Sequence, residues 1–298
     1  MKLAFLISTD KDAHQLRNLI YSLPDDAVFF IHIDSKRDLQ HFKQDLLREN
    51  ITFINHRVNL VEGSIREVEA QVELLRAALT DGADRMVFLT GGDYPLWSKQ
   101  RISDYFAKAG DSEIISGIAM PGQGRAAYPY TDFRPLAGKS WRMLSVKGQM
   151  RSGLKRMLNG LHIHKTLRIY CPEKTYTLYK GASSWAITPE LARLIVKTWD
   201  DNERLVTYFR TSYHPVETFV QTVAFNSDQA PHCKLVKGRY PGIDALSPLT
   251  FIDGYPNAKI LTEDDLAEVK CSGKMFCRKM VSKYSDGLRS LIDAERED

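Results

Sequence analysis

Short apolar runs alternate with segments of helical periodicity through the first third of the chain. The runs predict buried strands at residues 3–8, 28–34, 51–54 and 86–89. Between them, apolar residues recur at helical spacing across residues 14–23 and 65–79. This order predicts the α/β class, with a mainly parallel mixed sheet flanked by helices.

A second regular region begins near residue 175. Strands are predicted at residues 176–179 and 185–187. Thr188 and Pro189 then form the pattern of an N-cap and a first helical residue, and this helix should continue to residue 196. Another helix is predicted over residues 217–225, with Glu217 in its first turn, where the helix dipole stabilises a carboxylate.

Length and charge restrict the possible classes. The 298 residues suit one large domain or two modest ones, with enough chain for a substantial core. The net charge of +4 is too small to indicate a nucleic-acid or membrane partner by itself.

The charge is unevenly distributed, because residues 133–172 contain nine Lys or Arg residues and no Asp or Glu. The apolar residues interleaved with them are Trp141, Met143, Leu144, Leu154, Met157 and Leu158. Such a segment can lie on an anionic membrane or bind a charged acceptor, and a solvated basic insertion is an equal alternative. Peripheral membrane contact through residues 134–168 is therefore a hypothesis. Nucleic acid is disfavoured as a partner, since no binding signature accompanies the charge.

The cysteines give no sign of a metal site or a disulfide framework. Cys171, Cys233, Cys271 and Cys277 form no Cys-x-x-Cys or Cys/His ligand spacing, so we expect reduced structural thiols. The residues before Thr9 are too few for a signal peptide, and no run of about 18 apolar residues follows. We expect a cytoplasmic protein, with peripheral contact at the inner face of the plasma membrane.

Polar residues follow three of the predicted strands. Thr9, Asp34 and Asp93 lie at or just beyond the carboxyl ends of these strands. Ligands of open α/β sheets bind at this edge, which makes all three candidates for a binding site.

Asp10-Lys11-Asp12 spells the Asp-x-Asp pattern with which some sugar transferases hold a divalent cation. A motif of three residues occurs easily by chance, so this pattern alone is weak evidence for a metal site. A turn and helix-capping role is the favoured interpretation of both aspartates, and no metal site is predicted.

Six short motifs occur in order along the chain. They are Phe-Ile-His-Ile-Asp-Ser-Lys at 30–36, Val-Glu-Ala at 68–70, Phe-Leu-Thr-Gly-Gly-Asp-Tyr-Pro-Leu at 88–96, Lys-Gly-Ala-Ser-Ser-Trp at 180–185, Pro-Val-Glu at 215–217 and Phe-Cys-Arg-Lys at 276–279. Their order and spacing resemble the core-2/I-branching β-1,6-N-acetylglucosaminyltransferase family (glycosyltransferase family 14), which also includes peptide O-xylosyltransferases. The chain is similar to a bacterial-type member over nearly its whole length.

The resemblance implies a GT-A-like fold, a UDP-sugar donor as co-substrate, inversion at the anomeric carbon, and catalysis without a divalent metal or other cofactor. Glu217 matches the catalytic base, Asp34 the acid on the uridine side of the donor, and Lys279 the lysine on the diphosphate. Thr9 is also expected on the donor side.

Residues 180–185 and Asp93 match the acceptor-side and sugar-side lining, with Ser183, Ser184 and Trp185 as the candidate contacts. The chain departs from the family pattern in two places. Glu62 stands where an aromatic residue is common, and Thr250 where a basic residue is frequent. The second cation on the diphosphate is therefore open between Arg278 and Lys259.

The expected organisation is a single GT-A-like catalytic domain. Residues 1–130 would form the nucleotide-donor half, residues 131–174 a basic insertion, and residues 175–298 the acceptor and catalytic half.

In this interpretation fixed cations neutralise the leaving diphosphate while Glu217 deprotonates the acceptor hydroxyl. GlcNAc is the favoured sugar and xylose the next. The expected acceptor is a glycan or lipid-linked oligosaccharide of surface polysaccharide synthesis. A glycoside hydrolase using Asp93 as a second carboxylate ranks low, and a non-catalytic carbohydrate-binding or membrane-surface protein on the same scaffold remains the alternative.

Overall fold

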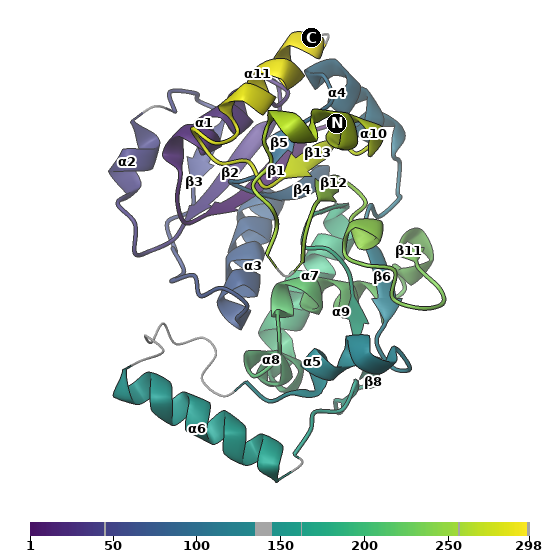
Figure 1. The fold of residues 1–298 in the computed structure, drawn as a ribbon. Coiled ribbons are helices and arrows are strands. Elements are labelled where there is room, and N and C mark those ends of the chain that lie inside the picture. The colour runs from purple at the N-terminus through teal and green to yellow at the C-terminus, as the bar shows by residue number, and fades with distance from the viewer. Residues whose placement is uncertain (45, 135–144, 162, 256, 297–298) are drawn as a thin grey trace.

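A five-stranded sheet forms the centre of the computed structural model, which describes residues 1–298 except 45, 135–144, 162, 256 and 297–298 (Figure 1). The strand order is β10-β4-β1-β2-β3. The strands are β1 (Leu3–Thr9), β2 (Val28–Ile33), β3 (Ile51–Phe53), β4 (Arg85–Thr90) and β10 (Trp185–Ile187). Every neighbouring pair is parallel except β10 with β4. The predicted α/β class with a mainly parallel sheet is therefore confirmed.

Helices cover both faces of this sheet, because alternate strand residues point to opposite faces. In β1, Ala4 and Leu6 belong to one apolar cluster, whereas Phe5 and Ile7 belong to the other. The first cluster includes residues of α3 (Ile65–Thr80), α7 (Pro189–Asp201), α8 (Glu203–Arg210) and α9 (Phe219–Phe225), and the second includes residues of α1 (Ala13–Tyr21), α2 (Leu39–Lys43) and α4 (Lys99–Lys108).

Smaller sheets and short helices surround the central sheet. The remaining strands are β5 (Tyr94–Pro95), β6 (Ser116–Ala119), β7 (Arg168–Tyr170), β8 (Thr175–Thr177), β9 (Tyr179–Lys180), β11 (Lys234–Leu235), β12 (Thr250–Ile252) and β13 (Phe276–Arg278). The remaining α-helices are α5 (Tyr128–Thr131), α6 (Val146–Gly160), α10 (Leu266–Cys271) and α11 (Asp286–Glu295), and the 3₁₀ turns are η1 (Gly124–Ala127), η2 (Pro215–Glu217), η3 (Ala230–His232), η4 (Asp244–Leu246) and η5 (Glu263–Asp265).

The cap predicted at Thr188 is confirmed. Its side chain accepts a hydrogen bond from the backbone of Leu191, Pro189 is the first residue of α7, and the helix continues to Asp201 instead of ending near residue 196. The strand predicted at 176–179 is divided, since β8 pairs with β7 whereas β9 pairs with β6.

The helix predicted from residue 217 begins later. Glu217 lies in the 3₁₀ turn η2, and α9 starts at Phe219. The carbonyl of Glu217 accepts a hydrogen bond from the backbone of Gly181, at 2.9 Å. Thr218, with φ −132° and ψ −29°, separates the turn from the helix. The argument from the first turn of a helix therefore does not apply to Glu217.

All four cysteines are free thiols, in agreement with the expectation from their spacing. Within the described ranges, the structure contains no helix of the length and apolarity required to cross a bilayer.

Trp185 belongs to the core. Its side chain is fully buried and stacks on Phe88 of the neighbouring strand, with ring centroids 5.3 Å apart. The indole therefore packs between β10, β4 and the helices of the first cluster and does not line a ligand cavity.

We expect Trp185→Ala to lower the free energy of unfolding by about 3 to 5 kcal/mol, because it leaves a large cavity in this core. Urea denaturation measures the loss, and Trp185→Phe should retain most of the stability. Unchanged stability combined with weaker ligand binding would instead support a lining role.

Candidate active site

A cavity of about 740 Å³ opens where β1, β2 and β4 end. Thr9, Asp34 and Gly91 are among the residues that line it. The backbone of Asp34 donates to the carbonyl of Thr9 at 3.0 Å, which holds the ends of β1 and β2 together. The two candidate donor-side residues thus meet in one cavity, at the strand edge where ligands of such sheets bind.

The carboxylate of Asp34 is buried and held in place by donors. Its Oδ1 accepts from the backbone of Lys36 at 3.1 Å and from that of Leu60 at 3.3 Å, and its Oδ2 lies 3.1 Å from the Lys36 ammonium. These contacts fix one orientation of the side chain at the cavity wall.

Lys279 lines the same cavity from the C-terminal part of the chain. Its backbone is held on both sides, because its N–H donates to Lys259 at 3.2 Å and its carbonyl accepts from Leu261 at 3.0 Å. The next residue, Met280, donates to Gly92 at 2.9 Å, which ties the segment to the loop after β4. Among the residues that the structure describes, no carboxylate forms an ion pair with the Lys279 ammonium.

Arg278 is paired with Asp93. The guanidinium donates from Nε to Oδ1 at 2.9 Å and from Nη2 to Oδ2 at 2.7 Å, and its Nη1 donates to Ser183 Oγ at 3.2 Å. Asp93 is fully buried, so it lies behind the cavity wall, whereas Arg278 and Ser183 are part of that wall. Ser184 is also fully buried, with its hydroxyl 3.4 Å from that of Ser247.

Lys259, the other candidate for the second cation, forms an ion pair with Asp265 at 2.6 Å. It is absent from the described residues that line the cavity.

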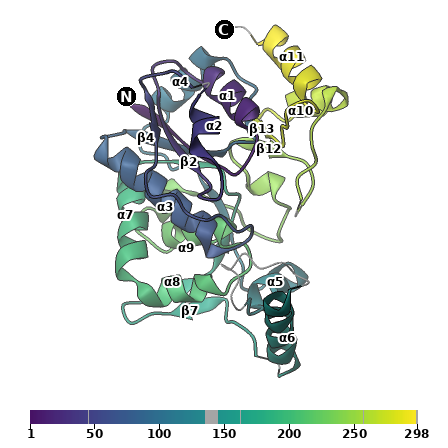
Figure 2. The same cartoon turned by 90° about the vertical axis from the view of Figure 1, so that its left-hand side faces the viewer.

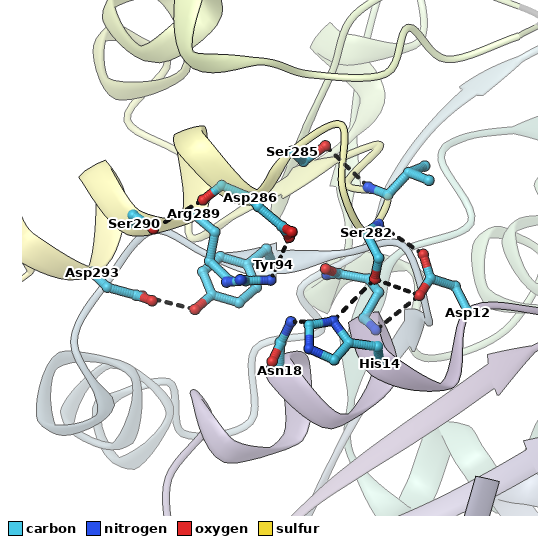
Figure 3. Close-up of polar contacts among 12 residues, drawn as sticks. Asp12, His14, Asn18, Tyr94, Ser282, Ser285, Asp286, Arg289, Ser290 and Asp293 are labelled. Carbon is cyan, nitrogen blue, oxygen red and sulfur yellow. Dashed lines mark hydrogen bonds and ion pairs between the residues drawn. The ribbon is translucent and has the colours of Figure 1, made fainter. Parts of the chain in front are cut away.

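Asp12 caps α1 and anchors the segment after Lys279 (Figure 3). Its Oδ1 accepts from the backbone of Gln15 at 3.0 Å and from Ser282 Oγ at 2.6 Å, and its Oδ2 accepts from the Ser282 backbone at 2.8 Å. The capping role predicted for Asp12 is confirmed. Among the described residues, no group of three or more His, Cys, Asp and Glu side chains could hold a metal ion.

Glu217 lies beside the cavity, since the adjacent Val216 lines it. Its carboxylate is almost completely buried, and Oε2 is 3.1 Å from the Lys180 ammonium. Two phenols also donate to Oε2, Tyr255 at 3.0 Å and Tyr130 at 3.4 Å. Three donors therefore converge on one carboxylate oxygen.

Lys180 is held among aromatic rings. Its ammonium lies 4.2 Å from the ring centroid of Tyr255, 5.0 Å from that of Tyr240 and 5.2 Å from that of Tyr130. Burial lowers the pKa of Lys180, and the charge of Glu217 opposes this shift. Burial and the same negative charge raise the pKa of the Tyr130 and Tyr255 phenols, which keeps both as hydrogen-bond donors.

A second carboxyl, Glu67 on α3, lines the cavity. Burial raises its pKa from 4.5 to about 8, and the charges of Glu62 and Glu217 act in the same direction. Its Oε2 accepts a hydrogen bond from the backbone of Gly63 at 2.9 Å, which opposes the shift. Burial therefore favours the protonated form of Glu67.

Sequence reasoning missed four parts of this site: the pairing of Lys180 with Glu217, the phenols Tyr130 and Tyr255, and the carboxyl of Glu67. Lys180 lies in a recognised motif, but the motif does not reveal its partner. The tyrosines stand outside every motif, and only the fold brings them to Glu217.

The mainly parallel sheet, with helices on both faces and a polar cavity at its carboxyl edge, agrees with a GT-A-like fold. The chain belongs to the Core-2/I-Branching enzyme family, whose pattern it matches over residues 3–238. It is therefore a glycosyltransferase, with a sugar donor and a glycan acceptor. The match ends before Arg278 and Lys279.

Other comparisons show only distant similarity. An active-site mutant of LgtC is 12% identical, with 99% of this chain and 94% of that chain covered and a TM-score of 0.48. The 4-diphosphocytidyl-2C-methyl-D-erythritol synthase of Anaerococcus prevotii DSM 20548 is 12% identical, with 91% and 95% covered and a TM-score of 0.41. Neither similarity bears on the reaction of this chain. A search of curated proteins gave no match.

Because the pKa of Glu67 is raised in the folded protein, we expect the free energy of unfolding to depend on pH through this group. Between pH 4.5 and about 8 the unfolded chain loses this proton while the folded protein keeps it, so the contribution of Glu67 to the free energy of unfolding falls as pH rises. Glu67→Gln should remove this contribution, and the variant should gain stability relative to the wild type across that range. Urea denaturation of both proteins at several pH values measures the difference, and a pH-independent difference would contradict the raised pKa.

Proposed function

We propose that the protein is an inverting, metal-independent transferase that moves a sugar, GlcNAc first and xylose next, from a UDP-sugar to an acceptor hydroxyl. The acceptor is a glycan or lipid-linked oligosaccharide of surface polysaccharide synthesis, reached from the inner face of the plasma membrane. The observation that carries the proposal is the separation of charged groups. Lys279 supplies a cation at the cavity without a described carboxylate partner, whereas Glu217 supplies a carboxylate beside it.

The donor side follows from the position of Lys279 at the strand edge. An ammonium there can neutralise charge that gathers on a departing diphosphate. The Arg278 guanidinium at the same wall is already engaged by Asp93, so its contribution to the diphosphate is secondary to that of Lys279. Asp34, fixed at the end of β2, is suited to accept hydrogen bonds from the nucleoside.

Metal independence is supported by the state of Asp12. In an Asp-x-Asp metal site the carboxylates face the diphosphate, but both oxygens of Asp12 accept hydrogen bonds from Ser282. A cation at Asp12 would compete with these bonds, which hold the segment after Lys279 against α1.

In the transfer step one proton is transferred, one bond to the anomeric carbon forms and one breaks. An acceptor hydroxyl oxygen attacks the anomeric carbon from the side opposite UDP, and its proton passes to the Glu217 carboxylate. The bond from the anomeric carbon to the diphosphate breaks, and its electron pair remains on the leaving UDP oxygen. Lys180 acts as a positioning residue, because its ammonium and the two phenols hold one oxygen of Glu217 and leave the other for the acceptor.

Glu217→Gln should leave UDP binding within about twofold of the wild type and reduce turnover by about 10² to 10⁴, the usual effect of removing a general base. Release of UDP from a panel of UDP-sugars, with and without glycan acceptors, measures turnover. Glu190→Gln is the matched control, since Glu190 is exposed on α7. Turnover of Glu217→Gln at the wild-type rate would exclude Glu217 as the base.

Lys279→Ala should weaken UDP binding by about 10- to 100-fold, the effect of losing a hydrogen bond to a charged group. Calorimetry in the presence of EDTA measures this affinity, and wild-type binding should persist there. Lys283→Ala serves as the control, because Lys283 is exposed four residues away. Loss of wild-type binding on chelation, with recovery on adding Mn²⁺, would contradict metal independence.

A further inference from the structure

The helix α6 stands apart from the layers around the central sheet. Figures 1 and 2 show it from two directions at the end of the molecule furthest from α11. It is formed by Val146–Gly160, within the basic segment that the sequence singles out. The family assignment and the proposed reaction give this helix no role.

The outward side of α6 is apolar. Val146, Met150, Leu154 and Met157 recur at the spacing that places residues on one face of a helix. Their exposed fractions are 76%, 69%, 37% and 53%. Leu161, just beyond the helix, is 62% exposed.

The side of α6 turned toward the protein carries small residues. Gly148 is buried and Ser152 is half-buried, and both lie roughly opposite Met150 around the helix. A surface helix normally turns its apolar side inward. The reversed arrangement in α6 leaves an apolar stripe in water, which indicates an interaction surface.

The positive charge of α6 indicates an anionic partner. Its residues include Lys147, Arg151, Lys155 and Arg156 and no acidic residue. Lys147 and Arg156 are exposed, and they lie on opposite sides of the apolar stripe. An apolar stripe flanked by cations fits the boundary between anionic headgroups and acyl chains.

Two other cations of the segment do not belong to this surface. Lys165 is buried, where it donates to Ser212 and to Thr211 Oγ1, the latter at 3.1 Å. Arg134 lies over the ring of Tyr213, 4.1 Å from its centroid. The basic surface expected over residues 134–168 is therefore smaller than the sequence indicates, and Trp141, Met143 and Leu144 fall outside the described residues.

We propose that the outward face of α6 docks the enzyme on an anionic lipid bilayer, with Val146, Met150, Leu154 and Met157 in the headgroup boundary. Docking would hold the active site near a lipid-linked acceptor. The inference therefore rests on the proposed function. Membrane binding is measured without catalysis, so the two proposals can fail separately.

Flotation with phosphatidylcholine vesicles, with and without phosphatidylglycerol, tests the proposal on the full chain. The wild type should float with phosphatidylglycerol vesicles at low salt, and high salt should release it. The double variant Met150→Ser/Met157→Ser should bind at least about tenfold more weakly, with unchanged UDP affinity as proof of folding. Leu47→Ser/Tyr284→Ser removes two exposed apolar residues elsewhere and should bind like the wild type.

Three results would overturn the proposal. The first is no flotation of the wild type, and the second is equal flotation of the two double variants. The third is a stable dimer that Met150→Ser/Met157→Ser dissociates, since the stripe would then belong to contact between two copies. If vesicle binding holds while Glu217→Gln keeps full turnover, only the proposed catalytic role fails.

Discussion

The buried ion pair between Asp93 and Arg278 is the constraint on which the site depends. Asp93 has no exposed surface, and besides Arg278 its Oδ2 accepts from the backbone and hydroxyl of Thr90 at 2.6 and 3.0 Å. A buried carboxylate of this kind is costly unless it is paired, and removal of one partner of such a pair typically costs about 3 to 5 kcal/mol. The pair joins the end of β4 to β13, and through Ser183 to the loop before β10. It therefore fixes the place where the chain delivers Lys279 to the cavity.

Because of this pairing, the neighbouring cations Arg278 and Lys279 have different surroundings. The planar guanidinium of Arg278 makes a bidentate contact with Asp93, for which a guanidinium is better suited than an ammonium. Lys279 carries a compact ammonium charge at the cavity wall. On the other side of the site, Lys180 neutralises Glu217 within a ring of tyrosines. Asp93 and Glu217 thus each have a cation of their own, and the Lys279 ammonium lines the cavity without an ion-pair carboxylate among the described residues.

Much of the scaffold could be predicted because it depends on local patterns. Apolar runs locate β1, β2 and β4, and parallel strands bring Thr9 and Asp34 together at their carboxyl ends. The errors fall where tertiary contacts override local preference. Glu217 lies in a 3₁₀ turn and not in α9, and its carbonyl accepts a long-range hydrogen bond from the backbone of Gly181. Trp185 follows a ligand-lining motif but meets Phe88 in the core. Lys165 counts as a surface cation in sequence, yet the fold buries it and lowers its pKa to about 7.

The two carboxyls near the cavity, Glu217 and Glu67, differ in their surroundings, and this difference bears on the proposal that Glu217 is the base. A base must be unprotonated before the reaction, and burial, which raises the pKa of Glu67 to about 8, favours the protonated form of that carboxyl. The Lys180 ammonium and two phenols donate to Glu217 Oε2, whereas Glu67 Oε2 accepts from the backbone of Gly63. The negative charge of Glu217 is itself one reason that Glu67 stays neutral. The two carboxyls therefore interact across the site, because a negative charge on Glu217 favours the protonated form of Glu67.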